Sequence, residues 1–157
     1  MKLPVDFRDV LVCLYDAEVE FMVIGGYAVA HHGHVRATKD IDVFVRPTRE
    51  NAAKVMLALE AFGAPLAALA IDADDFATPG KVIQLGVPPL RIDILTAATA
   101  LDFEDASQTT GRLNIDGRPV AVIGLDALLK NKRAAGRPQV LADATSLERL
   151  RTLKPST

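Results

Sequence analysis

Apolar positions recur along the chain with two spacings, which predict a mixture of helices and strands. A helical period predicts a first helix over residues 6–20 and another that runs from a cap at Thr48 to about Phe62. Shorter apolar runs bounded by Gly, Pro or Asp predict strands at 21–24, 38–45, 82–87, 90–95, 113–115 and 119–123. Further helices are predicted at 27–32, 97–108, 125–135 and 138–150.

Turn residues separate these elements. Asp116-Gly117 lies between two strand-like runs and predicts a hairpin with a type I′ turn. The segment 63–79 is ambiguous, because its alanines suit a helix while Pro65 and an acidic group suit a loop, with at most one short strand. That acidic group consists of Asp72, Asp74 and Asp75.

The order of the predicted elements indicates the fold class. Strands alternate with helices early in the chain, then strands follow one another, and helices come last. We therefore expect an α/β (α+β) fold with a mixed, mostly antiparallel sheet flanked by helices. A chain of 157 residues suits a single domain, spanning 1–157, whose helical C-terminal part begins at about residue 125.

Composition narrows the class of protein. Half of the residues are hydrophobic, 24% are charged and the formal net charge is -2, so a broadly basic nucleic-acid-binding protein is not indicated. Cys13 cannot form an intrachain disulfide and fits a buried apolar position. No apolar run approaches the roughly 20 residues that span a bilayer, so we expect a cytoplasmic protein without a membrane partner.

The first candidate chemistry lies between residues 21 and 46. Alternate residues of a strand share a face, so Asp40 and Asp42 point one way while Ile41 and Val43 point the other way. Two adjacent carboxylates repel each other unless a cation compensates, and oxygen ligands suit Mg²⁺. The preceding Gly25-Gly26 turn opens a short helix, whose backbone N–H groups suit phosphate. Together they predict a site for a metal-bound nucleotide.

Asp93 is a third strand aspartate, flanked by Ile92 and Ile94. Three carboxylates on neighbouring strands can hold one or two divalent cations, which is the arrangement used for phosphoryl transfer. In that interpretation Asp93 completes the second metal site or accepts the proton of the incoming hydroxyl. The alternative is that strand aspartates only protect a sheet edge or face solvent, and it carries most weight for an isolated Asp-x-Asp pair.

These residues resemble a known signature. The string GGYAVAHHGHVRATKDIDVFV, with Gly-Gly, a short helix and then Asp-Ile-Asp, is similar to the DNA polymerase β-type nucleotidyltransferase superfamily. It resembles in particular the small bacterial nucleotidyltransferases of the AbiEii toxin-like group. The segment 132–138, KRAAGRP, followed by Asp143, is similar to that group's C-terminal motif. The resemblance covers the chain from about residue 21 to about residue 150.

The resemblance implies an activity and roles for particular residues. It implies two Mg²⁺ ions and transfer of a nucleoside monophosphate from an NTP to an acceptor, with release of pyrophosphate. Gly25 and Gly26 would bind the triphosphate, and Asp40, Asp42 and Asp93 would bind metal. Lys132 would approach the phosphates, and Asp143 would orient it or close the site. Arg36 and Thr38 match an Arg-x-Thr pair that would contact phosphate; otherwise they belong to a solvated loop.

Several functional alternatives remain open. The enzyme could be the toxin of a toxin–antitoxin pair that modifies tRNA and binds a cognate antitoxin, or it could modify a protein or a small molecule. A rival hypothesis is a non-catalytic nucleotide- or partner-binding module that retains the fold, and a third is a structural partner that uses the first helix. The basic residues near the C-terminal helices fit either a solvated face or a site for triphosphate or RNA; these are Lys130, Lys132, Arg133 and Arg137.

Three histidines follow the Gly-Gly turn, at positions 31, 32 and 34. Adjacent imidazoles point to different faces of the chain and no cysteine is nearby, so zinc binding is not favoured. We expect one of them to pack beneath the loop and another to line the nucleotide pocket.

Overall fold

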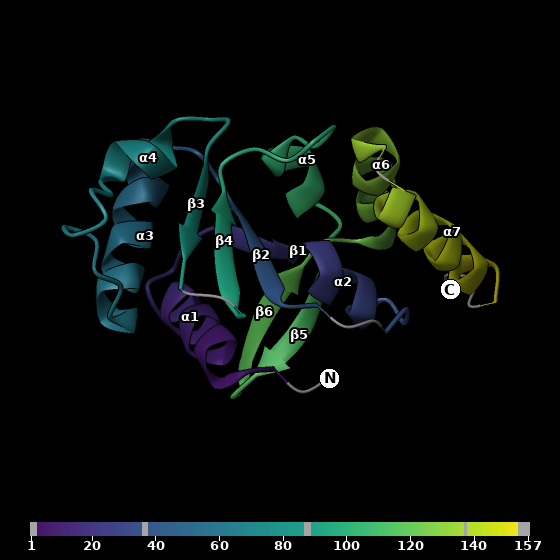
Figure 1. Ribbon diagram of the computed structural model, residues 1–157, viewed down its shortest axis with the longest axis horizontal. Coiled ribbons are helices and arrows are strands. Elements are labelled where there is room, and N and C mark those ends of the chain that lie inside the picture. The colour runs from purple at the N-terminus through teal and green to yellow at the C-terminus, as the bar shows by residue number, and fades with distance from the viewer. Residues whose placement is uncertain (1–2, 36–37, 87–88, 137, 154–157) are drawn as a thin grey trace.

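The computed structural model describes residues 3–35, 38–86, 89–136 and 138–153 (Figure 1). The strands are β1 Phe21–Ile24, β2 Asp40–Val45, β3 Val82–Leu85, β4 Arg91–Leu95, β5 Gly111–Ile115 and β6 Arg118–Val122. The helices are α1 Val5–Asp16, α2 Gly25–His31, α3 Arg49–Phe62, α4 Ala73–Ala77, α5 Phe103–Ser107, α6 Leu125–Ala135 and α7 Pro138–Leu153. Within these ranges no helix is both long and apolar enough to cross a membrane.

The strands form one sheet in the order β3-β4-β2-β1-β6-β5. β1 pairs antiparallel with β2, β3 with β4, and β5 with β6, whereas β1 pairs parallel with β6 and β2 with β4. This confirms the predicted mixed sheet, in which most of the described pairs are antiparallel. The predicted hairpin turn is also present, because Asp116 and Gly117 both have positive φ, at 50° and 84°.

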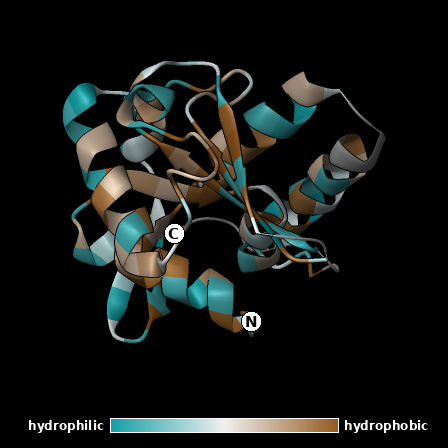
Figure 2. Ribbon diagram, turned by 60° about the vertical axis from the view of Figure 1, so that its left-hand side comes forward, coloured by the Kyte–Doolittle hydropathy of each residue, from teal (hydrophilic) through white to brown (hydrophobic). Residues whose placement is uncertain are grey.

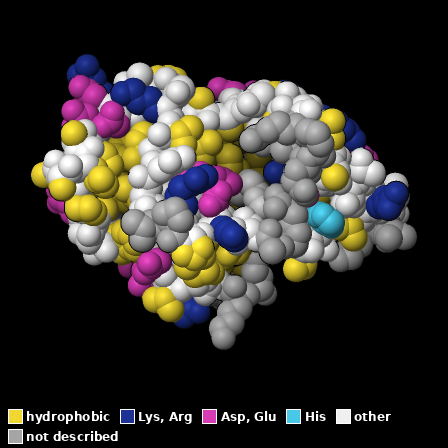
Figure 3. Space-filling model, in the orientation of Figure 1, with side chains coloured by type: hydrophobic (Ala, Val, Ile, Leu, Met, Phe, Trp, Pro, Cys, Tyr) yellow, Lys and Arg dark blue, Asp and Glu magenta, His cyan; other side chains and the backbone are white. Residues whose placement is uncertain are grey.

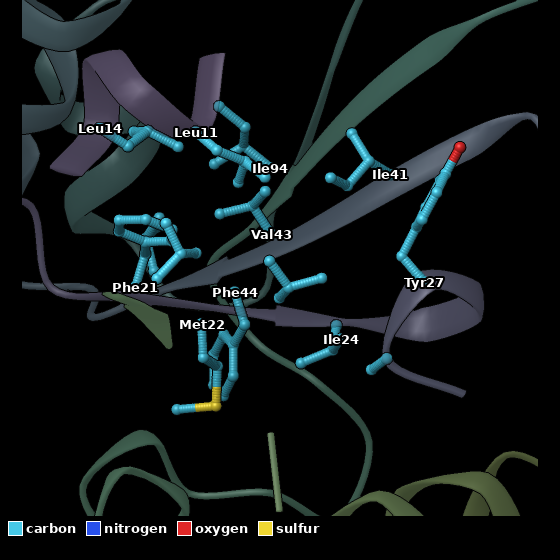
Figure 4. Close-up of a cluster of buried hydrophobic side chains, with 14 of the residues drawn as sticks. Leu11, Leu14, Phe21, Met22, Ile24, Tyr27, Ile41, Val43, Phe44 and Ile94 are labelled. Carbon is cyan, nitrogen blue, oxygen red and sulfur yellow. The ribbon is translucent and has the colours of Figure 1, made fainter. Parts of the chain in front are cut away.

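One face of the sheet is covered by α1 and α3. Val43 and Ile94 point from neighbouring strands towards Leu11 and Leu14 of α1 (Figure 4). All four side chains are fully buried. The colouring of Figure 2 follows this arrangement, with brown along the central strands and teal mixed into the surrounding helices. Burial of this apolar face holds the sheet at a fixed position against α1 and α3.

The opposite face of the sheet is partly apolar and carries the strand aspartates. Phe44 of β2 lies opposite Met22 of β1, and both are buried. Phe103 of α5 packs against Phe44 with its ring edge-on and the two centroids 5.1 Å apart. α5 therefore covers the half of this face that lies away from Asp40 and Asp42.

Asn51, in the first turn of α3, joins that helix to the two central strands. Its side chain is buried, accepts a hydrogen bond from the N–H of Glu20, and donates to the carbonyl oxygens of Glu20 and Arg46. Thr48 caps the same helix by accepting from the N–H of Asn51, as the sequence predicts. These bonds tie the start of β1 and the end of β2 to α3.

Several predicted boundaries differ from those of the structure. α1 ends at Asp16, before Glu18 adopts a positive φ of 61°. α2 begins at Gly25, so the glycines form the first turn of the helix and do not precede it. The predicted helix 97–108 is reduced to α5, since Ala98 and Leu101 form an isolated bridge around Ala100.

The sequence left the segment 63–79 open between a helix and a loop. It contains the short helix α4 and no strand among its described residues. The reason is a capping box, in which Asp72 accepts from the N–H of Asp75 and the Asp75 carboxylate accepts from the N–H of Asp72. The acidic group of this segment thus starts a helix.

Candidate active site

The register of β2 and β4 brings the three predicted aspartates together. The two strands are parallel, with Asp42 directly opposite Asp93 and Asp40 directly opposite Arg91. Opposite residues share a face, so all four side chains lie on the same side of the sheet. Asp93 is 7% exposed, whereas the Asp40 side chain is 38% exposed. The predicted proximity of Asp93 to the Asp-x-Asp pair is therefore confirmed.

Arg91 joins two of these carboxylates. Its Nη2 donates to Oδ2 of Asp40 at 3.0 Å, and its Nε donates to Oδ1 of Asp93 at 2.9 Å. A second bond runs from Nη2 to Oδ2 of Asp93 at 3.2 Å. The sequence interpretation missed Arg91, although its position two residues before Asp93 on a strand places both side chains on one face.

Asp42 carries the least compensated charge of the described carboxylates at this site. Burial, together with repulsion from Asp93 and Asp40, raises the pKa of Asp42 to about 6. Lys132 and Arg91 act in the opposite direction but do not cancel the increase in pKa. An added cation close to Asp42 would favour its charged form and lower that pKa.

The predicted glycine turn packs directly against this group. A Cβ placed on Gly25 would lie 2.0 Å from Oδ2 of Asp42, so only glycine leaves room for the carboxylate, and Gly25 also has a φ of +70°. A Cβ on Gly26 would lie 2.9 Å from Oγ1 of Thr38, which donates to the carbonyl oxygen of Asp40. Thr38 is thus part of the same cluster. Arg36 lies outside the described residues.

Lys132 and Asp143 come from α6 and α7 and meet in the interior. Nζ of Lys132 lies 3.6 Å from Oδ2 of Asp143, and both residues are buried, at 7% and 0% exposure. Nε2 of His34 lies 3.7 Å from the other carboxylate oxygen of Asp143. The predicted Lys132–Asp143 pairing is therefore present. Lys132 is close enough to Asp42 for its charge to lower the pKa of that carboxyl.

The other two histidines lie on α2 and directly after it. Nε2 of His32 is 2.7 Å from the carbonyl oxygen of Ile123, so His32 packs against the end of β6. His31 meets His32 edge to face, and burial followed by repulsion from His32 lowers the pKa of His31. His32 thus contacts the segment directly after β6, and both a histidine beneath the loop and one in the nucleotide pocket stay predictions.

The basic residues near the C-terminal helices do not act as one cluster. Lys132 points into the interior, whereas Arg133 is exposed and forms an ion pair with Glu148 of α7. Arg137 lies outside the described residues. A solvated helix face therefore accounts for Arg133, and Lys132 is the basic residue that contributes to the candidate site.

The carboxylate oxygens of this site are ligands that suit Mg²⁺, but they do not converge on one point. Among residues 3–35, 38–86, 89–136 and 138–153, no three His, Cys, Asp or Glu side chains are arranged to hold a metal ion. The guanidinium of Arg91 instead links Asp40 to Asp93. Carboxylate oxygens are nevertheless the ligands that Mg²⁺ takes, and the raised pKa of Asp42 indicates uncompensated negative charge. Figure 3 shows acidic and basic side chains together near the middle of this face of the molecule.

Comparison with known proteins gives likeness at the level of fold. No model of a known protein family matches the chain, and no curated protein matches it in sequence. Among solved structures, TM1012 from Thermotoga maritima, assigned as a nucleotidyltransferase, aligns with a TM-score of 0.56 at 14% identity, over 94% of this chain and 91% of that chain.

The antibiotic-resistance factor ANT(2'')-Ia aligns similarly in two structures. The crystal structure with adenylyl-2''-tobramycin gives a TM-score of 0.53 at 16% identity, over 94% of this chain and 93% of that chain. The solution structure gives 0.51 at 18% identity, over 94% and 88%. At such identities the likeness is one of architecture. The chain therefore has the mixed α/β fold of these nucleotidyltransferases.

Proposed function

We propose that this protein is a Mg²⁺-dependent nucleotidyltransferase, which moves a nucleoside monophosphate from an NTP to an acceptor and releases pyrophosphate. The observation that carries the proposal is the register of β2 and β4, with Asp42 opposite Asp93 and Gly25 packed against the Asp42 carboxylate. The fold shared with nucleotidyltransferases is a second line of support.

Each side chain of the site has a proposed task. Asp40, Asp42 and Asp93 hold Mg²⁺, which when bound neutralises charge on the phosphates and on the reacting oxygens. The acceptor hydroxyl attacks the α-phosphorus, its proton passes to Asp93, and the bond between the α-phosphorus and the bridging oxygen breaks as pyrophosphate leaves. Gly25 and Gly26, in the first turn of α2, bind the triphosphate beside Asp42 through their backbone N–H groups.

The buried cation Lys132 faces the phosphates in this proposal. Asp143 holds the Lys132 side chain in place, since its Oδ2 lies 3.6 Å from Nζ of Lys132. Because Lys132 already lowers the pKa of Asp42, its charge acts at the place where negative charge would accumulate. Arg91 would release Asp40 and Asp93 when metal binds, since the carboxylate oxygens it contacts are the proposed ligands. Thr38 and Arg36 are proposed phosphate contacts on the segment before β2.

The finer assignments rest on the sequence resemblance. Membership of the AbiEii toxin-like group, a tRNA acceptor and a cognate antitoxin partner are proposed from the motifs at 25–42 and 132–143. ANT(2'')-Ia supports a different kind of acceptor, because its crystal structure contains adenylyl-2''-tobramycin. A small molecule and an RNA are thus both compatible with the proposed reaction.

The direct test is transfer of label from an NTP. Purified protein is incubated with Mg²⁺, each NTP labelled at the α-phosphate, and total cell extract, with EDTA in a parallel sample. We expect label to move onto an acceptor and pyrophosphate to accumulate, with both signals abolished by EDTA. A double Asp40→Asn, Asp42→Asn variant should lose transfer, because amides replace the proposed metal ligands without a change of shape.

The matched control is Asp74→Asn, which makes the same chemical change on α4, at an exposed residue outside the candidate site. It should transfer label like the wild type. If the wild type binds NTP but transfers nothing to any component of the extract, the non-catalytic binding module becomes the better description. If it does not bind NTP with Mg²⁺, the proposal is wrong.

A further inference from the structure

The turn that follows α2 holds the backbone of His34 in a fixed position. Gly33 has a left-handed φ of 108°, and its N–H donates to the carbonyl oxygen of Ala30 at 3.0 Å. The N–H of His34 donates to the carbonyl oxygen of Val29 at 3.2 Å, and the two bonds together form a Schellman motif. Val29 is fully buried. His34 is therefore anchored to the same helix whose first turn packs against Asp42.

The imidazole of His34 reaches α7. Its Nε2 lies 3.7 Å from Oδ1 of Asp143, while Oδ2 of the same carboxylate lies 3.6 Å from Nζ of Lys132. The His34 side chain is 31% exposed, whereas the Asp143 side chain is completely buried. The two oxygens of Asp143 thus face nitrogens from two different parts of the chain, α6 and the segment after α2.

Packing of α7 against α6 places the backbone of Asp143, but it does not orient the carboxylate. The two helices contact each other, and Ala144 and Leu147 of α7 are buried, as is Leu128, one turn before Lys132. The last torsion of an aspartate side chain has broad preferences, so the carboxylate can rotate unless contacts hold it. A contact at Oδ1 therefore determines where Oδ2, the oxygen beside Lys132, is held.

Lys132 needs such support if its charge is to act at one place. Its side chain is long and flexible, and it loses rotational freedom when it is held in one position. Its charge already lowers the pKa of Asp42, which places it next to the candidate metal ligands. Misplacement of a substrate-binding group by about 1 Å can lower a rate on the order of a hundredfold. A residue that fixes Lys132 would thus affect phosphate binding without any contact to phosphate.

We infer that His34 is a positioning residue, which acts through Asp143 to hold Lys132 towards the triphosphate. His34 itself does not touch the nucleotide in this arrangement. It connects α2, whose first turn binds the triphosphate in the proposed function, to α6 and α7, so the phosphate-binding groups of these elements keep one relative position. This inference rests on the proposed function and adds one residue to its site.

The first experiment measures binding of inorganic triphosphate in the presence of Mg²⁺ by calorimetric titration. This ligand reports on phosphate binding without any choice of base or acceptor. His34→Ala should weaken binding about tenfold, as the loss of a supporting contact does at metal sites. His34→Gln should bind nearly as tightly as the wild type, because its amide Nε2 can donate from about the position of the imidazole Nε2. His34→Asn has a shorter side chain and should be as weak as His34→Ala.

Two results of this experiment would overturn the inference. The first is that His34→Ala binds inorganic triphosphate as tightly as the wild type. The second is that His34→Gln binds no better than His34→Asn, because the position of the nitrogen that faces Asp143 would then not matter.

The second experiment asks whether His34 acts through Asp143. His34→Ala is measured again in an Asp143→Asn background. It should weaken binding about tenfold when Asp143 is present and very little when it is replaced, because the effects of residues that act through one contact are not additive. An equal loss in both backgrounds would overturn the inference. If Asp143→Asn does not fold, the comparison of His34→Gln with His34→Asn decides by itself.

Glu148→Ala is the control for a general loosening of α7. Glu148 also contacts α6, through an ion pair with Arg133 that lies outside the candidate site. Its truncation should leave binding of inorganic triphosphate unchanged, and a loss as large as that of His34→Ala would show that the effect is not specific to His34. A wild type that binds neither NTP nor inorganic triphosphate would contradict the proposed function, and this inference with it. A wild type that binds both, with His34→Ala equally tight, contradicts this inference alone.

Discussion

The space that a side chain on Gly25 would need is filled by Asp42, whose Oδ2 would lie 2.0 Å from a Cβ placed there. This contact links the first turn of α2 to the central carboxylate of β2. Gly25 also has a φ of +70°, which L-residues with a side chain rarely adopt. Two independent constraints therefore require glycine at this position.

Gly25→Ala should weaken Mg²⁺-NTP binding at least about tenfold, because the new methyl group must displace the Asp42 carboxylate or move α2. The measurement is calorimetric titration with a non-hydrolysable NTP. Gly80→Ala is the matched control, since Gly80 has a φ of +90° but a Cβ there meets nothing within 4 Å. It should cost about 1 kcal/mol of stability from backbone strain alone and leave NTP affinity unchanged. Equal affinities for both variants would show that the Gly25–Asp42 contact does not matter for binding.

Because the pKa of Asp42 is raised, replacing this residue should increase the stability of the folded protein by an amount that depends on pH. Its pKa rises from 3.8 to about 6 on folding. Between these two pH values the folded, metal-free protein therefore keeps a proton that the unfolded chain releases. The Asp42 contribution to stability is therefore present below about pH 4 and is lost as pH rises through about 6. A shift of this size corresponds to about 3 kcal/mol.

Asp42→Asn should accordingly become more stable than the wild type as pH rises, with a difference approaching about 3 kcal/mol above pH 6. Urea unfolding of both proteins in EDTA, from pH 4 to pH 8, measures this difference. Mg²⁺ should raise the melting temperature of the wild type more than that of the variant. A stability difference that does not change with pH would mean that Asp42 titrates normally.

Arg91 donates to Asp40 and Asp93 in the space where a cation would bind, so it should compete with Mg²⁺. Arg91→Gln removes the competing charge and should tighten Mg²⁺ binding several-fold in calorimetric titration. Arg118→Gln is the control, because Arg118 forms a similar two-point contact with Asp16 outside the candidate site. Weaker Mg²⁺ binding by Arg91→Gln than by the control would mean that Arg91 organises the carboxylates for the metal.

The buried side chain of Asn51 satisfies one backbone N–H and two carbonyl oxygens of the central strands' ends. Asn51→Ala should therefore lower the free energy of unfolding by about 2–3 kcal/mol, because these polar groups lose their partner. Chemical denaturation monitored by circular dichroism measures this. Asn131→Ala, which removes one bond to the carbonyl oxygen of Thr99, should cost no more than about 1 kcal/mol. Similar losses for both variants would contradict a special role for Asn51.

Local patterns were sufficient for much of the fold. Alternation along 40–45 put both aspartates on one face, Thr48 marked the start of α3, and Asp116-Gly117 marked the hairpin. Each of these features depends on neighbouring residues only, through the geometry of a strand, a cap or a turn. The predicted elements were wrong where the local preference for helix or strand is weak. In 97–108, for example, only α5 forms.

The residues of the candidate site could be proposed from the sequence, but not the way in which they are arranged. The sequence indicated Gly25, Asp40, Asp42 and Asp93 from their types and spacing. It did not indicate that Arg91 would join Asp40 to Asp93, since that contact depends on the pairing of two strands about fifty residues apart.

The sequence by itself determined which residues are candidates for the chemistry and which face of its own strand each one occupies. Only the tertiary structure decided which of these faces meet, where burial raises the pKa of Asp42, and which neighbours compensate its charge. The physical reason is that periodicity within a strand is local, whereas strand order, register and desolvation arise only when distant segments pack against one another.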